Sequence, residues 1–213
     1  MVLLRIIAII LITASLHGCD EPLATFSEPQ PVNMENLPRI PKRLQGHYLN
    51  QTDNSQLAID DQQIQRIYDF DVKGHLNQLD SNIRLSGDTL INLETKEKTL
   101  VKFDGDSLVI HQHQIDTLFH LDNDHVMRKF KGYYFISSLY DKGSWEVKKI
   151  QLSKGRLILS KISEKLDIDN LKSITETNQD TLSTYKFQVS RKQFREFIDH
   201  EGFRDSETFV RTK

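Results

Sequence analysis

The chain has 213 residues, of which 38% are hydrophobic and 27% are charged, and 28 lysine and arginine residues stand against 30 acidic ones. Because basic and acidic residues are interspersed, the chain lacks the basic footprint of a nucleic-acid-binding protein, and no nucleic acid is expected as a partner. The single cysteine excludes an internal disulfide, so the fold has to be held by its hydrophobic core.

The first 18 residues have the pattern of a secretory signal peptide. Arg5 is the only charged residue among the first 19, and a mostly apolar run extends from residue 6 to residue 16. As a helix this run spans about 16 Å, whereas a bilayer core measures about 30 Å, so it is too short for a comfortable transmembrane helix. Ordinary secretory cleavage after Gly18 requires a small residue at the place that Leu16 occupies.

Leu16, Gly18 and Cys19 instead resemble the lipobox of bacterial lipoproteins. In that family the signal peptide is cut before the cysteine, whose thiol carries a diacylglycerol and whose new amine is usually acylated. The resemblance implies lipidation at Cys19 and a membrane of the bacterial cell envelope as partner, with the outer membrane favoured if the source has two membranes. Two or more acyl chains anchor a protein firmly, since each buried methylene contributes about 0.8 kcal/mol. Asp20 and Glu21 resemble a surface-sorting signal of Bacteroidota-type bacteria, whereas an aspartate after the cysteine marks inner-membrane retention in enterobacterial lipoproteins.

All five prolines lie in the segment that follows the cysteine, between residues 21 and 42. This segment has no apolar period of a helix or a strand, and proline removes a donor and favours extended backbone. Residues 19–44 are therefore predicted to be a lipidated N-terminus and a semi-rigid, proline-rich tether. The alternative is that the end of the segment packs along the domain through Leu37, Ile40 and Leu44. Residues 45–213 are predicted to form a β-rich globular domain, with two small domains as the alternative.

The domain is expected to consist of short strands separated by turns, because apolar and β-branched runs alternate with turn residues such as Asp104-Gly105. The expected strands cover residues 87–94, 98–103, 105–113, 114–121, 125–130, 145–152 and 156–162. The last two form a hairpin whose apolar alternation breaks near Lys148-Lys149, which predicts a bulge there. Two of the expected strands begin with the same dipeptide, Gly87-Asp88 and Gly105-Asp106. Such a recurrence is typical of a repeated turn-plus-strand unit in a meandering sheet.

A helix is predicted near the C-terminus, where Ser190 and Gln193 have the spacing of a capping box. Phe194, Phe197 and Ile198 then share one face, and Gly202 ends the helix. A shorter helix is expected over residues 169–175, and strands over 184–189 and 207–211. The predicted fold class is mainly β: an antiparallel meander, as a sandwich or an open barrel, with a small α/β element and this one helix near the C-terminus.

Two patterns suggest metal binding, each with a simpler interpretation. His111 and His113 lie two residues apart, which on a strand places both on one face, with His120, His125 or Asp124 as further ligands. The pattern lacks the spacing of a structural zinc site, and a solvated strand face is the simpler interpretation. Residues 69–80 resemble a calcium loop, but Lys73 occupies a ligand position, so a turn between strands is favoured. No metal and no cofactor are predicted.

The remaining candidates do not form a catalytic constellation. The sequence has no Gly-x-Ser-x-Gly elbow and no phosphate-cradling glycine loop, and its cysteine is assigned to the lipid. A group of aromatic residues lines either a ligand cleft or the core: Tyr48, Tyr133, Tyr134, Phe135, Tyr140 and Trp145. No catalytic residue is predicted.

The sequence thus favours a lipid-anchored cell-envelope protein that is a non-catalytic binding or interaction module. One alternative is a lipocalin-like carrier of a small apolar ligand, and a second is an envelope hydrolase. The proline-rich segment, followed by strands that open with Gly46-His47-Tyr48, gives the chain a general resemblance to uncharacterised β-rich lipoproteins of Bacteroidota-type bacteria. That resemblance implies no particular activity.

Overall fold

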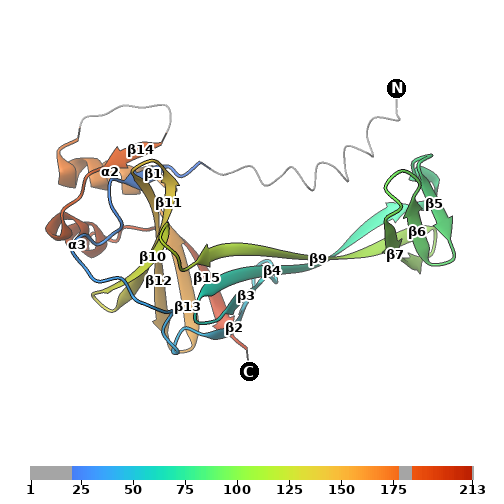
Figure 1. Ribbon diagram of the computed structural model, residues 1–213, viewed down its shortest axis with the longest axis horizontal. Helices are drawn as coiled ribbons and strands as arrows, with labels where there is room; N and C mark the ends of the chain where they lie inside the picture. Colours follow the sequence, from blue (N-terminus) through green and yellow to red (C-terminus); the bar gives the residue numbers. More distant parts are fainter. Residues whose placement is uncertain (1–20, 178–183, 213) are drawn as a thin grey trace. The chain divides into compact units, whose positions relative to one another are not determined.

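The computed structural model describes residues 21–177 and 184–212 (Figure 1). The predicted fold class is confirmed, since the protein is mainly β and has a helix near its C-terminus. The predicted signal peptide, residues 1–18, and Cys19 lie outside the described residues.

The described residues form two compact units instead of the one domain predicted over 45–213. The small unit consists of residues 68–114, and the main unit consists of residues 21–67 together with the described residues from 115 onward. Strands β4 (Gln63–His75) and β9 (Ser107–His120) each contribute residues to both units. The expected strands 105–113 and 114–121 are therefore one continuous strand, β9.

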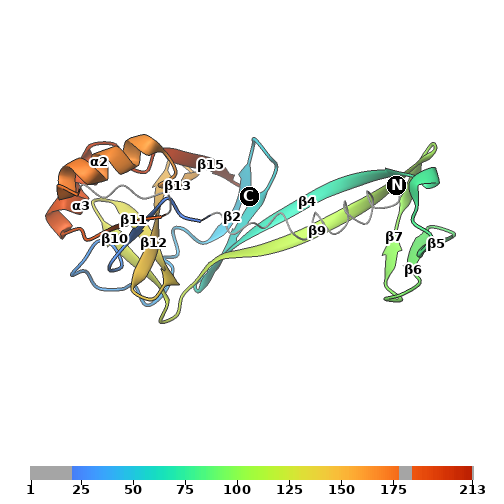
Figure 2. The ribbon, with the colours of Figure 1, turned by 90° about the horizontal axis from the view of Figure 1, so that it is seen from above.

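The main unit is built on a sheet with the strand order β10-β11-β12-β13-β15-β2-β3-β4-β9, whose strands are labelled in Figure 1 and seen from above in Figure 2. From β10 round to β4, neighbouring strands pair antiparallel. The remaining bounds are β2 (Gly46–Asn50), β3 (Gln56–Ile59), β10 (His125–Phe130), β11 (Tyr133–Asp141), β12 (Ser144–Ser153), β13 (Arg156–Lys161) and β15 (Asp205–Arg211).

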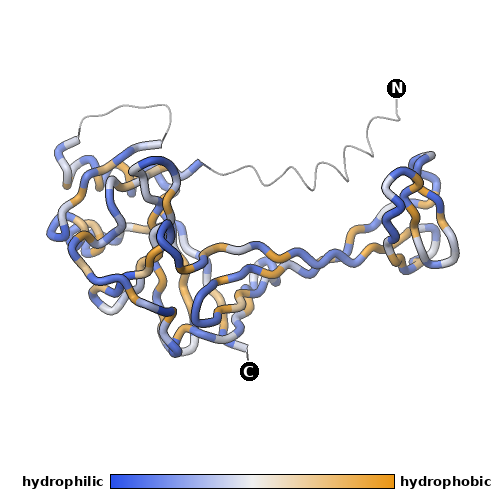
Figure 3. The backbone as a smooth tube through the Cα atoms, in the orientation of Figure 1, coloured by the Kyte–Doolittle hydropathy of each residue, from blue (hydrophilic) through white to orange (hydrophobic). Residues whose placement is uncertain are grey.

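The main unit has two cores, because side chains along a strand alternate between the two faces of a sheet. Figure 3 shows hydrophobic and hydrophilic residues interleaved along the backbone of this unit. The helix core, completed by α2 (Lys165–Thr175) and α3 (Arg191–Asp199), consists of Ala24, Phe26, Phe135, Val147, Ile162, Ile168, Leu171, Phe187, Val189, Phe194, Phe197, Ile198 and Phe203. The cavity core consists of Ile40, Leu44, Tyr48, Leu57, Ile59, Ile64, Phe119, Met127, Tyr134, Ile136, Ile150, Leu157 and Phe209.

The two cores also explain the break in alternation that predicted a bulge near Lys148-Lys149. At these residues strand β12 pairs continuously with β11, and from Lys149 onward it also pairs with β13. The register shift between β11 and β12 lies between Leu139 and Asp141. Val147 is buried in the helix core and Ile150 in the cavity core. The apolar period changes because both faces of the strand are covered, so the prediction of a bulge there was wrong.

The described residues of the predicted tether, 21–44, belong to the main unit. Strand β1 (Ala24–Phe26) pairs in parallel with β14 (Tyr185–Phe187), and Phe26 is opposite Trp145 of β12. The Ile40 N–H donates to the Asp61 carbonyl oxygen over 2.8 Å, and Phe26, Ile40 and Leu44 are fully buried. The alternative, in which the end of this segment packs along the domain, describes residues 37–44 better. The apolar residues of this segment show no helix or strand period, because prolines and irregular backbone set their spacing. Periodicity could therefore not predict their burial.

Helix α3 begins as predicted. The Ser190 hydroxyl accepts the Gln193 N–H, and the Gln193 side chain accepts the Ser190 N–H in return, which is a capping box. Phe194, Phe197 and Ile198 are the buried residues of the helix. Helix α2 begins at Lys165, four residues before the start predicted at residue 169.

The small unit contains a separate three-stranded antiparallel sheet of β5 (Ile83–Ser86), β6 (Thr89–Asn92) and β7 (Lys98–Leu100). Strand β8 (Lys102–Asp104) pairs with β9, and a 3-10 turn, η1, covers Leu76–Gln78. The core of the small unit contains Leu90, Val101 and Leu108, against which Leu79, Ile83, Leu85 and Ile110 pack. The predicted strand 98–103 is thus two short strands, because buried Val101 separates β7 from β8.

Candidate functional site

A cavity of about 170 Å³ lies on the cavity-core face of the main unit. Its apolar lining is formed by Leu57, Ile59, Ile64, Leu118, Ile136, Ile150, Leu157 and Leu159. Its polar lining is formed by Arg66, Lys148, Ser160, Lys161, Asp205 and Glu207. The lining comes from seven strands that are far apart in the sequence, so the cavity exists only in the folded sheet.

Strand alternation places these side chains. On β12, Lys148 and Ile150 line the cavity, whereas Val147, directly before Lys148, lies in the helix core. On β15, Asp205 and Glu207 line the cavity in the same alternating way. This alternation along the strands gives the cavity an apolar interior with some charged residues in its lining.

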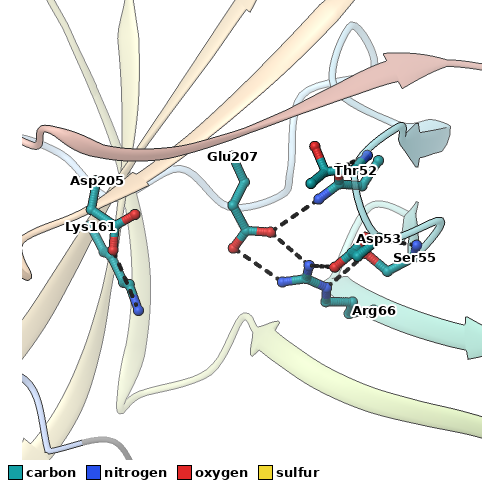
Figure 4. A network of polar contacts seen from close by, with 8 residues as sticks. Thr52, Asp53, Ser55, Arg66, Lys161, Asp205 and Glu207 are labelled. Atoms are coloured by element: carbon teal, nitrogen blue, oxygen red, sulfur yellow. Dashed lines mark hydrogen bonds and ion pairs between the residues drawn. The ribbon is translucent and has the colours of Figure 1, made fainter.

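Arg66 is the centre of a polar network beside the cavity (Figure 4). Its guanidinium donates two hydrogen bonds to the Glu207 carboxylate, over 3.1 and 2.6 Å, and one to Asp53 over 2.7 Å. Its Nε donates to the Ser55 hydroxyl over 3.0 Å, and the guanidinium lies 5.5 Å from the centre of the Phe209 ring. Because the Arg66 side chain is only 12% exposed, these partners offset the cost of removing its charge from water.

The other charges around the cavity are also paired. Lys161 lies 3.6 Å from Asp205, which accepts a hydrogen bond from Ser163, and Lys148 lies 3.2 Å from Glu146. Each carboxylate in the lining therefore has a cation nearby.

The pKa of Asp53 reflects the position of this carboxyl group in the Arg66 network. Partial burial raises the pKa of Asp53 and is the largest single effect on it. The two hydrogen bonds from Ser55 and the positive charge of Arg66 together outweigh burial, so the pKa of Asp53 is lower than its usual value. The network therefore favours the ionised carboxylate at neutral pH.

The cavity suits a small apolar ligand. A volume of about 170 Å³ is close to that of a cavity of about 150 Å³ that holds benzene. Pockets for drug-sized ligands measure about 300–1,000 Å³ and are larger. The lining contains no histidine or cysteine, and its carboxylates lie beside cations.

His111 and His113 lie on one face of β9 in the small unit, as their spacing predicts. His111 Nδ1 is 3.0 Å from Asp71 Oδ1, and His113 Nδ1 is 2.7 Å from Asp69 Oδ1. The hydrogen bond with His113 is the main effect that lowers the pKa of Asp69. Within residues 21–177 and 184–212, no group of three or more histidine, cysteine, aspartate or glutamate side chains is arranged to hold a metal ion.

Residues 69–80 do not form a calcium loop, because Asp69 to His75 belong to strand β4 and the 3-10 turn follows. Lys73 makes an ion pair with Asp104 over 2.8 Å. His120 and His125 lie near Asp122 instead of joining His111 and His113.

The six aromatic residues considered for a ligand cleft do not gather in one place. Tyr48 and Tyr134 are buried in the cavity core, and Phe135 is buried in the helix core with Tyr133 packed against it. Tyr140 is 44% exposed. None of the six lines the cavity.

One fully buried carboxyl group, that of Asp167 on α2, lies away from the cavity and binds the loop after α3. Its Oδ2 accepts the Arg204 N–H over 3.0 Å, while its Oδ1 has no hydrogen-bond partner within the described structure. Burial raises the pKa of Asp167 above its usual value. The Arg204 N–H group and the positive charge of Arg204 lower this pKa, but burial outweighs them. Through this hydrogen bond, and an ion pair of 3.7 Å between Arg204 Nε and Oδ1, the buried carboxyl group ties α2 to the loop after α3.

Comparisons with protein-family models, with curated proteins and with solved structures give no match to this chain. No helix among the described residues is long and apolar enough to cross a membrane. The function therefore has to be inferred from the geometry above and from the lipobox-like sequence around Cys19.

Sequence reasoning missed Arg66, Asp53 and Glu207, although one signal was present. Arg66 follows Ile64 by two residues and Glu207 precedes Phe209 by two, so on strands each charged residue shares a face with a core residue. A charge on the apolar face of a strand requires a partner. The pairing itself joins residues 141 positions apart, which no local pattern contains.

Proposed function

We propose that this protein is a lipid-anchored cell-envelope protein whose main unit is a non-catalytic binding module for a small apolar ligand. The observation that carries the proposal is the cavity: eight apolar side chains form its interior, and the charged groups in its lining lie beside partners of opposite charge. Such a lining favours an uncharged ligand, because a charged one would compete with ion pairs that already exist.

The anchor is supported by Leu16, Gly18 and Cys19 together with the short apolar run before them. We expect the protein to partition into the detergent phase after fractionation of the producing cells, because its acyl chains bury in a membrane. Cys19→Ser should release the protein or leave it with its signal peptide uncut. Recovery of the mature protein in the soluble fraction, with a free Cys19 thiol, would refute the anchor.

Ligand binding is expected to stabilise the main unit against heat. Benzene and 1-hexanol, as probes of the cavity, should raise the melting temperature, since a ligand at ten times its dissociation constant adds about 1.4 kcal/mol to the free energy of unfolding. For a chain of this size that gain corresponds to about 3–6 °C. Scanning calorimetry at rising probe concentrations measures it.

Leu159→Phe should abolish this shift, because Leu159 lines the cavity and the larger ring occupies part of it. The matched control is Leu152→Phe, which makes the same change at a partly buried residue of the same core that does not line the cavity. Equal shifts in both variants would place the probes elsewhere. Hydrolysis of a nitrophenyl ester that stops in Glu207→Gln or Asp205→Asn would overturn the non-catalytic assignment and favour an envelope hydrolase.

A further inference from the structure

The three-stranded sheet of the small unit has one covered face and one open face. Leu90 of β6 is opposite Leu85 of β5 and Thr99 of β7, and both leucines lie in the core of the small unit. Their neighbours along the strands point to the other side. This outer face consists of two cross-strand rows: Arg84, Ile91 and Lys98, and then Ser86, Thr89 and Leu100.

The outer face is basic and apolar. Arg84 and Lys98 are exposed on either side of Ile91, and within the described residues neither side chain has an ion pair or a hydrogen bond. Leu100 is 72% exposed, the highest value among the exposed large apolar side chains of the described chain. Ile91 and Leu100 are diagonal neighbours on adjacent strands, close enough to form one apolar patch.

The acidic residues of the small unit do not neutralise this face. The unit has eight acidic and five basic residues, yet none of the six outer-face residues is acidic. Asp69 and Asp71 contact histidines, and Asp104 is paired with Lys73. The Asp80 and Glu94 carboxylates accept hydrogen bonds in the turns that flank the sheet. Of the other three acidic residues, Asp88 accepts a hydrogen bond from Thr89 of the outer face, and no ion pair joins Asp88, Glu97 or Asp106 to Arg84 or Lys98 within the described residues. The two cations of the outer face therefore remain available to a partner.

We infer that this outer face binds the surface of an anionic lipid membrane. Cationic side chains near anionic headgroups attract the protein, and exposed Leu100, with half-buried Ile91 as its diagonal neighbour, can enter the boundary between headgroups and acyl chains. An acidic protein would satisfy Arg84 and Lys98 but gives no reason for Leu100 to be so exposed. The membrane is also the partner that the proposed anchor at Cys19 brings within reach, and this one argument rests on the proposed function.

The test uses the mature chain without its lipid, residues 20–213, which keeps every described residue and lacks Cys19. It is mixed with vesicles of phosphatidylcholine alone or of phosphatidylcholine with phosphatidylglycerol, and the bound fraction is measured by sedimentation. We expect binding to the anionic vesicles only, weakened by salt. Arg84→Gln with Lys98→Gln should lower the partition coefficient about 30-fold, since each basic residue contributes about 1 kcal/mol at such a surface. Leu100→Ser should also weaken binding.

The control is Lys142→Gln with Lys192→Gln, which removes the same charge from two exposed lysines of the main unit and should leave binding within about twofold. Equal binding to both vesicle types, or an equal loss in the control, would overturn the inference. Retention on immobilised polyglutamate without vesicle binding would reassign the face to an acidic protein and also overturn it. Because the tested chain carries no lipid, its outcome is separate from that of the Cys19 fractionation.

Discussion

Phe197→Ala is expected to lower the free energy of unfolding by about 3–5 kcal/mol, the usual cost of deleting a buried phenylalanine ring. Phe197 of α3 is 0% exposed in the helix core, and its ring centre lies 5.3 Å from that of Phe203. A helix of nine residues is marginal in water, so α3 depends on this packing for its existence. The loss is large beside a typical total stability of about 5–15 kcal/mol.

Ser190→Ala in the same helix is the matched comparison, because it removes only a cap and should cost about 1 kcal/mol. Urea titrations of the two variants, compared with the parent protein, measure both values. The claim is the order of the effects, with the phenylalanine variant much less stable than the serine variant. Two small and equal losses would mean that α3 is loosely attached to the sheet.

Gly202 gives a second measure of how tightly Phe197 is packed. A Cβ atom at residue 202 would come within 2.5 Å of the Phe197 ring, which is closer than real Cβ contacts. The backbone at this residue needs no glycine-only conformation, since only Glu201 and Phe203 around it have positive φ values. The sequence suggests a helix stop at Gly202, whereas the structure explains this glycine by the ring that lies against it.

Helix α3 could be predicted from the sequence because its signals are local. Ser190 and Gln193 are three residues apart, and the three buried residues follow within one and a half turns. The β-rich class was also predictable, since strand periodicity and turn residues need only short windows. The cavity was not, because its lining gathers side chains from residue 57 to residue 207.

The division into two units was only the alternative in the sequence analysis, and its boundaries were not predicted, for a related reason. The strands of the small unit look no different in sequence from those of the main unit, since both combine apolar and β-branched residues with turns that contain glycine. What separates them is pairing: β5, β6 and β7 form a sheet of their own. Pairing between strands depends on contacts across the fold, and a single sequence contains little information about those contacts.

The proline-rich segment was the least predictable part, and Phe26→Ala tests its place in the fold directly. Phe26 is 0% exposed in the helix core, where its ring lies edge-on to Phe194 with 6.1 Å between centres. Its backbone belongs to β1, which pairs with β14 and touches β12 at Trp145. We expect Phe26→Ala to cost about 3–5 kcal/mol, as for other buried phenylalanines.

The control for Phe26→Ala is Phe103→Ala, the same substitution at a residue that is 52% exposed, for which a change of about 0.5 kcal/mol is expected. Trp145 is the only tryptophan and is the cross-strand partner of Phe26, so its fluorescence follows unfolding close to the altered site. If residues 24–26 were a removable tether, the two variants would melt alike and early proteolysis before residue 44 would leave the melting temperature unchanged. A large loss for Phe26→Ala alone would instead mean that the fold begins at β1, and that any flexible link to the proposed anchor at Cys19 is limited to the few residues before it.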